Sequence, residues 1–172
     1  MLEVTTRDFK LRHFRNGDAD AIVKYANNRR IYRPTLEIPY PYRRKDALEW
    51  IEQNHAEEAR KHPGMMSLAI VIDGEAVGCI GLSDIEGHKA GVGYWLAEEH
   101  WGRGIMTRAL KLTTRHALGE MGLRRLYAEV FLFNRASMRV LEKAGYKREG
   151  VLRKEVEKDG RLYDMALYAK VR

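Results

Sequence analysis

Short apolar runs bounded by turn residues alternate along the chain with longer segments in which apolar residues recur every three or four positions. The short runs predict β-strands, and the longer spacing predicts amphipathic helices. We therefore expect strands at residues 9–13, 66–72, 76–82, 90–96, 125–133, 146–156 and 162–170. We expect helices at residues 19–27, 46–60, 105–120 and 135–144.

Turn-forming residues separate these elements. Asp73-Gly74 and Asp159-Gly160 are typical of two-residue hairpin turns, so each predicts an antiparallel strand pair. Gly91 and Gly93 interrupt one strand and predict a β-bulge there. Residues 29–44 hold three of the four prolines and three tyrosines, and the proline spacing predicts a loop without regular structure.

The element order, β-α-α-β-β-β-α-β-α-β-β, predicts an α/β fold with a mixed, partly antiparallel sheet. The length of 172 residues fits a single domain over residues 1–172, and 45% hydrophobic with 32% charged residues is typical of soluble globular proteins. No apolar run approaches the ~20 residues that a membrane span requires. The single cysteine, Cys79, cannot form an internal disulfide, so we expect a reducing cytoplasm and a buried, inert thiol.

The charge balance is basic, because 31 lysines and arginines oppose 24 acidic residues to give a net charge of +7. The basic residues are spread along the chain and cluster at element ends, which favours a solvated surface over a nucleic-acid interface. A phosphate-rich ligand would also benefit from this charge. None of the six histidines has ligand spacing to a second His, Cys or carboxylate, so we expect no metal.

Residues 93–107 form the most informative stretch. An apolar strand end leads through an acidic turn to Gly102 and Gly104, directly before a helix that begins near Ile105. The first amides of a helix lack acceptors within it and the helix dipole adds positive charge, so this arrangement suits a phosphate or pyrophosphate. A plain strand-to-helix turn is the alternative. Thr107 stands where a dinucleotide fingerprint needs its last glycine, and no Walker Gly-Lys-Ser/Thr is present.

This stretch resembles the acetyl-CoA pyrophosphate loop of the GNAT superfamily of N-acetyltransferases, in the form typical of the RimJ/RimL-like branch. Residues 134–146 resemble the family segment Asn-x-x-Ser-x-x-x-Leu-x-x-x-Gly-aromatic, in which Asn134 is also a good helix N-cap and Gly145 a good helix terminator. The predicted element order matches the GNAT fold, so the resemblance covers essentially the whole chain.

The resemblance implies acetyl-CoA as the acyl donor and assigns its contacts. The backbone of Tyr94, Trp95 and Leu96 is expected beside the pantetheine arm, like an added strand. Asn134 is expected to hydrogen-bond the pantetheine, with Ser137 near the sulfur. The residues expected to cradle the pyrophosphate are Gly102, Arg103, Gly104, Ile105, Met106 and Thr107.

The catalytic residues are less well defined. Many superfamily members carry a tyrosine, as the acid for the departing thiolate, at the position of Leu141, which cannot donate a proton. Ser137 is the replacement that related branch members imply, and a role in the first helical turn is its alternative. Glu129 shares a strand face with Tyr127 and Phe131, where a raised pKa would suit a general base, but a structural ion pair is the competing reading.

The expected reaction is direct transfer of acetyl from acetyl-CoA to a primary amine, because no activated nucleophile for a covalent intermediate is evident. The branch resemblance favours a protein N-terminal α-amine, as on a ribosomal protein. Alternatives are a small-molecule amine (polyamine, amino sugar, antibiotic or amino acid) and a non-catalytic CoA-binding module. We expect residues 29–44 to form one wall of the acceptor groove, opposite the hairpin at Asp159-Gly160. The sequence leaves the oligomeric state open, with a homodimer as one alternative.

Overall fold

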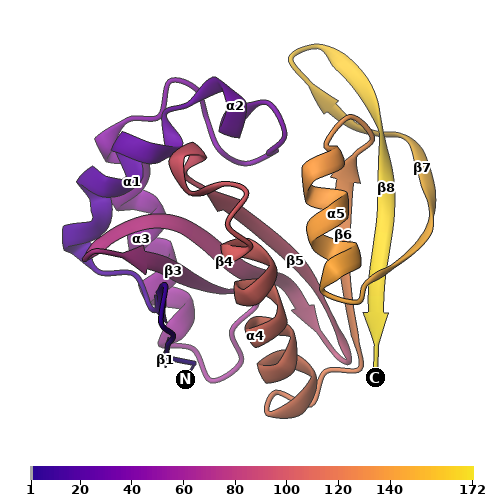
Figure 1. Cartoon of the computed structure of the whole chain (residues 1–172), viewed down its shortest axis with the longest axis horizontal. Coiled ribbons are helices and arrows are strands. Elements are labelled where there is room, and N and C mark those ends of the chain that lie inside the picture. The colour runs from indigo at the N-terminus through magenta and orange to yellow at the C-terminus, as the bar shows by residue number, and fades with distance from the viewer. Residues whose placement is uncertain (1) are drawn as a thin grey trace.

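One eight-stranded sheet, in the order β1-β2-β3-β4-β5-β6-β8-β7, organises the computed structural model, which describes residues 2–172 (Figure 1). Every neighbouring pair is antiparallel except β5 and β6, which are parallel. The strands are β1 (Val4–Thr5), β2 (Lys10–Arg12), β3 (Met66–Ile72), β4 (Glu75–Glu86), β5 (Lys89–Leu96), β6 (Arg125–Phe131), β7 (Lys147–Lys158) and β8 (Arg161–Val171).

Helices cover both faces of the sheet. They are α1 (Ala19–Ala26), α2 (Arg29–Tyr32), α3 (Arg44–Glu58), α4 (Ile105–Gly119) and α5 (Arg135–Lys143). In Figure 1, α4 and α5 lie in front of the sheet, whereas α1 and α3 lie behind its β2–β4 half. In residues 2–172, no helix combines the length and the apolar character needed to span a membrane.

The core has two parts because successive strand residues point to opposite faces. On β3, Leu68 and Ile70 pack in the cluster with α4 and α5, while Ala69 and Val71 pack in the cluster with α1 and α3. Each part is closed by an amphipathic helix face, so both faces of this half of the sheet are buried. The mixed α/β fold predicted from the element order is confirmed.

The Asp-Gly turns lie where the sequence predicts them. Asp73 and Gly74 both have positive φ, at 49° and 86°, and join β3 to β4. Asp159 and Gly160, at 51° and 71°, join β7 to β8. Two positive φ angles in succession match the right-handed twist of the flanking strands, which fixes the register of each hairpin.

The structure adds one strand to the predicted set and corrects two expectations. β1 was not predicted, because its two residues are too short to give a pattern. Residues 29–44 are not wholly irregular: α2 forms one turn before Pro34, capped by Asn28, whose side chain accepts from the Arg30 amide at 2.8 Å. The bulge lies in β4 and not in β5, because the register shifts between Ser83 and Glu86.

Gly91 is needed for close approach rather than for a bulge. It pairs regularly with Ser83, and a Cβ built on Gly91 would lie 2.7 Å from the Ser83 Oγ and 3.5 Å from the Tyr127 ring. The irregular position falls beyond this pair, where Asp84 adopts a positive φ of 48°. The bulge that the sequence predicts in β5 therefore lies in the neighbouring strand, β4.

Candidate active site

The site begins where the two central strands separate. β5 and β6 pair only through Lys89–Gly91 with Arg125–Tyr127, and beyond these three pairs the strands diverge. Residues 92–96 of β5 and 128–131 of β6 therefore present facing edges across a gap that opens toward the glycine loop (Figure 1). Such edges carry main-chain N–H and C=O groups that a ligand with amide groups can satisfy.

A pocket of about 1130 Å³ occupies this separation and continues onto both faces of the sheet. It is large enough for an extended ligand together with a second, smaller one. The glycine loop and α5 contribute to its lining, as do β6 and the segment after α2. Basic side chains of Arg30, Arg33, Arg139 and Lys143 line it as well.

The start of α4 is built to bind an anion. Gly102 and Gly104 have φ angles of 76° and 71°, which residues with a side chain rarely adopt. Gly104 is the N-cap of α4 and has no side chain to bond the first helical amides, and the first turn, Ile105 to Thr107, contains no acidic residue. Backbone donors and the positive end of the helix dipole thus meet at the pocket.

The start of α5 faces the same pocket. Asn134 caps the helix, its Oδ1 accepting from the Ser137 amide at 3.1 Å, as the sequence predicts. The Ser137 Oγ lies 2.8 Å from the hydroxyl oxygen of Tyr94, which comes from β5. Leu141 is fully buried in the core beneath, so no proton donor reaches the pocket from that position.

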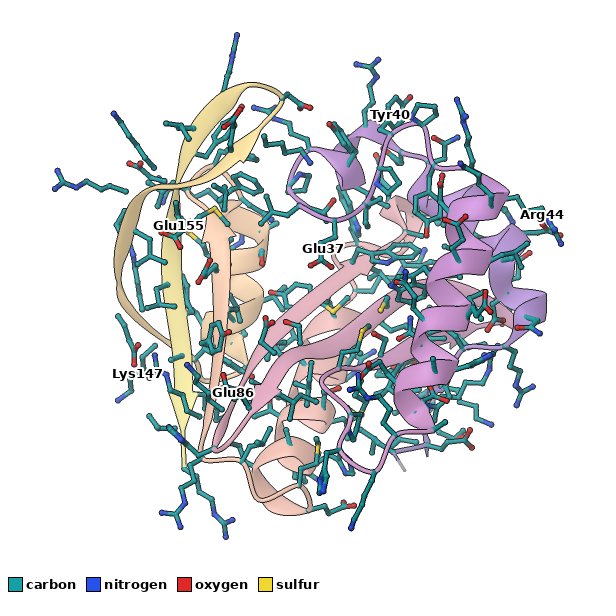
Figure 2. The ribbon with its side chains drawn as sticks, turned by 180° about the vertical axis from the view of Figure 1, so that it is seen from behind. Glu37, Tyr40, Arg44, Glu86, Lys147 and Glu155 are labelled. Atoms are coloured by element: carbon teal, nitrogen blue, oxygen red, sulfur yellow. The ribbon has the colours of Figure 1, made fainter. Side chains whose placement is uncertain are left out.

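The other side of the pocket is acidic. Glu129 on β6 lines the pocket, and burial, followed by the charges of Glu155 and Asp84, raises its pKa. Glu37 also lines the pocket, and Figure 2 shows it projecting from the segment after α2 toward the sheet. In the same view Glu86 and Glu155 appear on the sheet face opposite α4 and α5. This side therefore attracts cationic groups.

Residues 28–35, here called the α2 bridge, connect the two halves of the separated sheet. On the β5 side, Arg30 forms an ion pair with Glu98, and its guanidinium lies 5.1 Å from the ring centre of Trp101. On the β8 side, the Tyr32 hydroxyl donates to the Asp159 Oδ1 at 2.5 Å. The bridge therefore bounds the pocket at its wide end.

Lys158 and Arg33 add further contacts at the end of the α2 bridge that faces β8. Lys158 Nζ donates to the main-chain oxygen of Tyr32 at 2.8 Å and to that of Thr35, and it lies 3.8 Å from the Tyr32 ring centre. The Arg33 guanidinium lies 4.9 Å from the ring centre of Phe133. Residues 29–44 were expected to lie opposite the hairpin at Asp159-Gly160, and the two segments are in direct contact. Of the three tyrosines in residues 29–44, only Tyr42 lines the pocket.

All but one of the predicted site residues line this pocket. Those that do are Tyr94, Trp95, Leu96, Gly102, Gly104, Ile105, Met106, Thr107, Glu129, Asn134 and Ser137. Arg103 instead borders a separate cavity of about 250 Å³, together with Asp8 and Arg108. The sequence reasoning missed Glu155 and the Tyr94 hydroxyl, although strand alternation places Tyr94 with Val92 and Leu96 on the α5 side.

The fold and the site together combine a divided mixed sheet with a helix start that suits an anion, and comparison with protein families identifies this arrangement. Residues 8–147 match the family described as acetyltransferase (GNAT) domain. The chain therefore belongs to the GNAT acetyltransferase family.

Individual relatives are similar over parts or all of the chain. It is 48% identical over 69 residues to the probable N-acetyltransferase YjcK of Bacillus subtilis, a match covering 40% of this chain and 38% of YjcK. It is 32% identical over 99 residues to the ribosomal-protein-serine acetyltransferase of Escherichia coli, covering 56% of this chain and 55% of that enzyme. The matches thus span less than two thirds of either relative.

A solved structure matches over nearly the whole chain. Mycobacterium smegmatis RimJ, in complex with CoA-disulfide, has a TM-score of 0.85 and 28% sequence identity. The superposition covers 95% of this chain and 81% of RimJ.

Proposed function

We propose that this chain transfers the acetyl group of acetyl-CoA to a primary amine, with a protein N-terminal α-amine as the favoured acceptor. The observation that carries the proposal is the continuity of one pocket from the amides at the start of α4, through the separation of β5 and β6, to Glu129. The pyrophosphate would lie against Gly102–Thr107 without Arg103, and the pantetheine against the free edge of β5 and Asn134. The membership of the GNAT family supports the donor.

The residues of the acidic side would prepare the acceptor. An ammonium has no lone pair, so it must lose a proton before its nitrogen attacks the thioester carbonyl. Glu129 is proposed as the base, because a raised pKa brings a carboxylate closer to the basicity that proton transfer requires. An α-amine, with a pKa of ~7.7–8.0, needs less assistance than a lysine at ~10.4.

The remaining steps balance as follows. The new C–N bond forms, the C–S bond breaks, and the nitrogen loses a second proton as the amide is made. The departing thiolate accepts a hydrogen bond from the Ser137 hydroxyl, the proposed donor, and the proton that it finally takes up balances the second proton released by the nitrogen and reaches it through solvent. Cys79 lines the pocket, but burial raises its pKa to about 12, so it is a protonated thiol and a poor candidate for an acyl-enzyme nucleophile. Direct transfer within a ternary complex is therefore proposed.

The similarity to RimJ and to the Escherichia coli ribosomal-protein-serine acetyltransferase supports a protein N-terminus as acceptor. The second candidate is a small cationic amine such as a polyamine, which Glu37, Asp84 and Glu129 on the pocket wall favour. The two acceptors require different pockets. A peptide is larger and needs an open groove along the acidic side, whereas a polyamine needs only the carboxylates that bind its ammonium groups.

The test measures CoA release from acetyl-CoA with four acceptor classes. These are peptides with free N-termini, the same peptides with blocked N-termini and an internal lysine, polyamines, and amino sugars. Turnover confined to the free N-termini is the expected result. Turnover confined to polyamines would establish the second candidate, and CoA binding without turnover on any acceptor would contradict the proposed activity.

A further inference from the structure

Tyr94 and Ser137 meet across the separation of the two central strands. Tyr94 lies on β5 beyond Gly91, the last residue of that strand paired with β6, and its ring packs against the core cluster that includes α4 and α5. Its hydroxyl oxygen lies 2.8 Å from the Ser137 Oγ and 3.3 Å from the Ser137 main-chain oxygen. Both residues line the large pocket. The pair therefore lies where β5 and α5 approach one another, beside the proposed path of the pantetheine.

Each of the two hydroxyl groups carries one proton, and either could donate to the other. The direction of donation decides whether the Ser137 proton is free to hydrogen-bond a thiolate. If Ser137 donated to Tyr94, its only proton would be engaged and none would remain for a thiolate. If Tyr94 donates to Ser137, the serine oxygen uses a lone pair and its proton stays available. The Oγ is nearer to the phenol than the main-chain oxygen is, and a phenol is a better donor than an aliphatic alcohol.

We infer that Tyr94 is a positioning residue, whose phenol donates to the Ser137 Oγ and directs the serine proton toward the sulfur of the acyl donor. The inference rests on the proposed role of Ser137. It explains how an acid function survives with a buried leucine at 141: two hydroxyls from different elements replace one tyrosine on α5. The Asn134 cap fixes the backbone of Ser137, and Tyr94 fixes its side chain.

Tyr94 does not itself supply the proton. Burial raises the pKa of its phenol, an effect that the Ser137 hydrogen bond opposes in part. An ordinary thiol has a pKa of ~8.5, so net proton transfer to a CoA thiolate is unfavourable from the buried phenol and from the Ser137 alcohol alike, and both act as hydrogen-bond donors. The phenol remains protonated during turnover and acts as a hydrogen-bond donor, polarising the Ser137 hydroxyl along the chain Tyr94, Ser137, sulfur.

The experiment is a double-mutant cycle with Tyr94→Phe and Ser137→Ala. Tyr94→Phe should lower kcat about three- to tenfold, the range of one neutral hydrogen bond, and leave the KM for acetyl-CoA unchanged. In the Ser137→Ala background it should have no further effect, because the proton that it directs is gone. A residue needed only for packing would give independent effects in the two backgrounds.

Tyr146→Phe is the matched control. The Tyr146 hydroxyl lies 2.8 Å from the Thr114 Oγ1 in the same core, and burial raises its pKa to about 12. The variant removes a buried hydroxyl close to Tyr94 and leaves the Tyr94–Ser137 contact in place, so kcat should be unchanged. The melting temperature of each variant reports whether it is folded.

The outcomes separate this inference from the proposed function. An impaired Ser137→Ala with a fully active Tyr94→Phe, or additive effects, would overturn the role of Tyr94 and leave that of Ser137. A fully active Ser137→Ala would remove both. A crystal structure with CoA gives a readout that needs no turnover: the Tyr94 hydroxyl should stay on the Ser137 Oγ, and a direct bond from Tyr94 to the sulfur would also overturn the inference.

Discussion

The hydroxyl of Tyr32 donates a hydrogen bond to Asp159, 127 residues further along the chain. Tyr32 ends α2, and Asp159 occupies the tip of the β7–β8 hairpin, so this bond joins the two halves of a sheet whose central strands share three residue pairs. In the proposed reaction, the acceptor would reach the thioester beneath or beside this contact. The α2 bridge is therefore placed to influence acceptor binding more than donor binding.

Tyr32→Phe should raise the KM for the acceptor and leave that for acetyl-CoA unchanged. The contact is exposed, so the expected increase is about two- to threefold, the scale of exposed polar pairs. Steady-state kinetics with each substrate varied in turn measures the difference. Tyr40→Phe is the control, because it removes the hydroxyl of a ring whose centroid lies 5.6 Å from that of Tyr32 and leaves both the ring contact and the bond to Asp159 in place. Equal effects of both variants would argue against the hydrogen bond.

Gly104→Val should weaken acetyl-CoA binding by more than tenfold. The left-handed backbone at φ 71° is unfavourable for a β-branched residue, at a cost of roughly 1–2 kcal/mol, and its relaxation would move the first amides of α4. Isothermal titration with CoA measures the loss. Gly87→Val is the matched control, because Gly87 also has a positive φ, 57°, with nothing within 4 Å of its Cβ position, but lies in the β4–β5 turn. Both variants should lose stability, and only the first should lose affinity.

The acidic limb of the pH–activity profile should follow Glu129. A base must be ionised to work, so activity should rise as pH increases through the raised pKa of Glu129. Glu155→Gln removes a nearby negative charge, which makes the ionised form of Glu129 easier to reach, so the limb should move to lower pH. Glu129→Gln should abolish the limb and most of kcat. A limb that Glu155→Gln leaves in place would assign the base to another group.

The local features of the site could be predicted from the sequence, and the contacts between distant segments could not. The backbone conformations of Gly102 and Gly104 and the cap at Asn134 follow from preferences of single residues, so these local features are visible in a one-dimensional pattern. The Tyr32–Asp159 bond depends on two loop tips meeting in space, for which no periodicity exists. Tyr94 is intermediate, because alternation gives the face of its ring but not the partner of its hydroxyl.

The helix α2 shows the same limit. Prolines restrict the residues around them, which correctly predicts that no long element runs through residues 29–44. They do not prevent a single turn ahead of Pro34, and here the Asn28 cap supplies it. Its position matters because Arg30 and Tyr32 contact opposite halves of the separated sheet from this one turn.

The separation of β5 and β6 also makes the stability of the fold depend on its ligand. Two strand edges face each other inside the sheet, and an amide-bearing arm that satisfies them binds the folded state alone. By mass action the free energy of unfolding should then increase with ligand concentration, by about 2.7 kcal/mol at one hundred times the Kd. At equal ligand concentration, CoA should raise the melting temperature more than a 3′-phosphorylated ADP, because the nucleotide lacks the pantetheine and should bind less tightly. The supply of acetyl-CoA would in this way set not only how fast the protein works but how much of it stays folded.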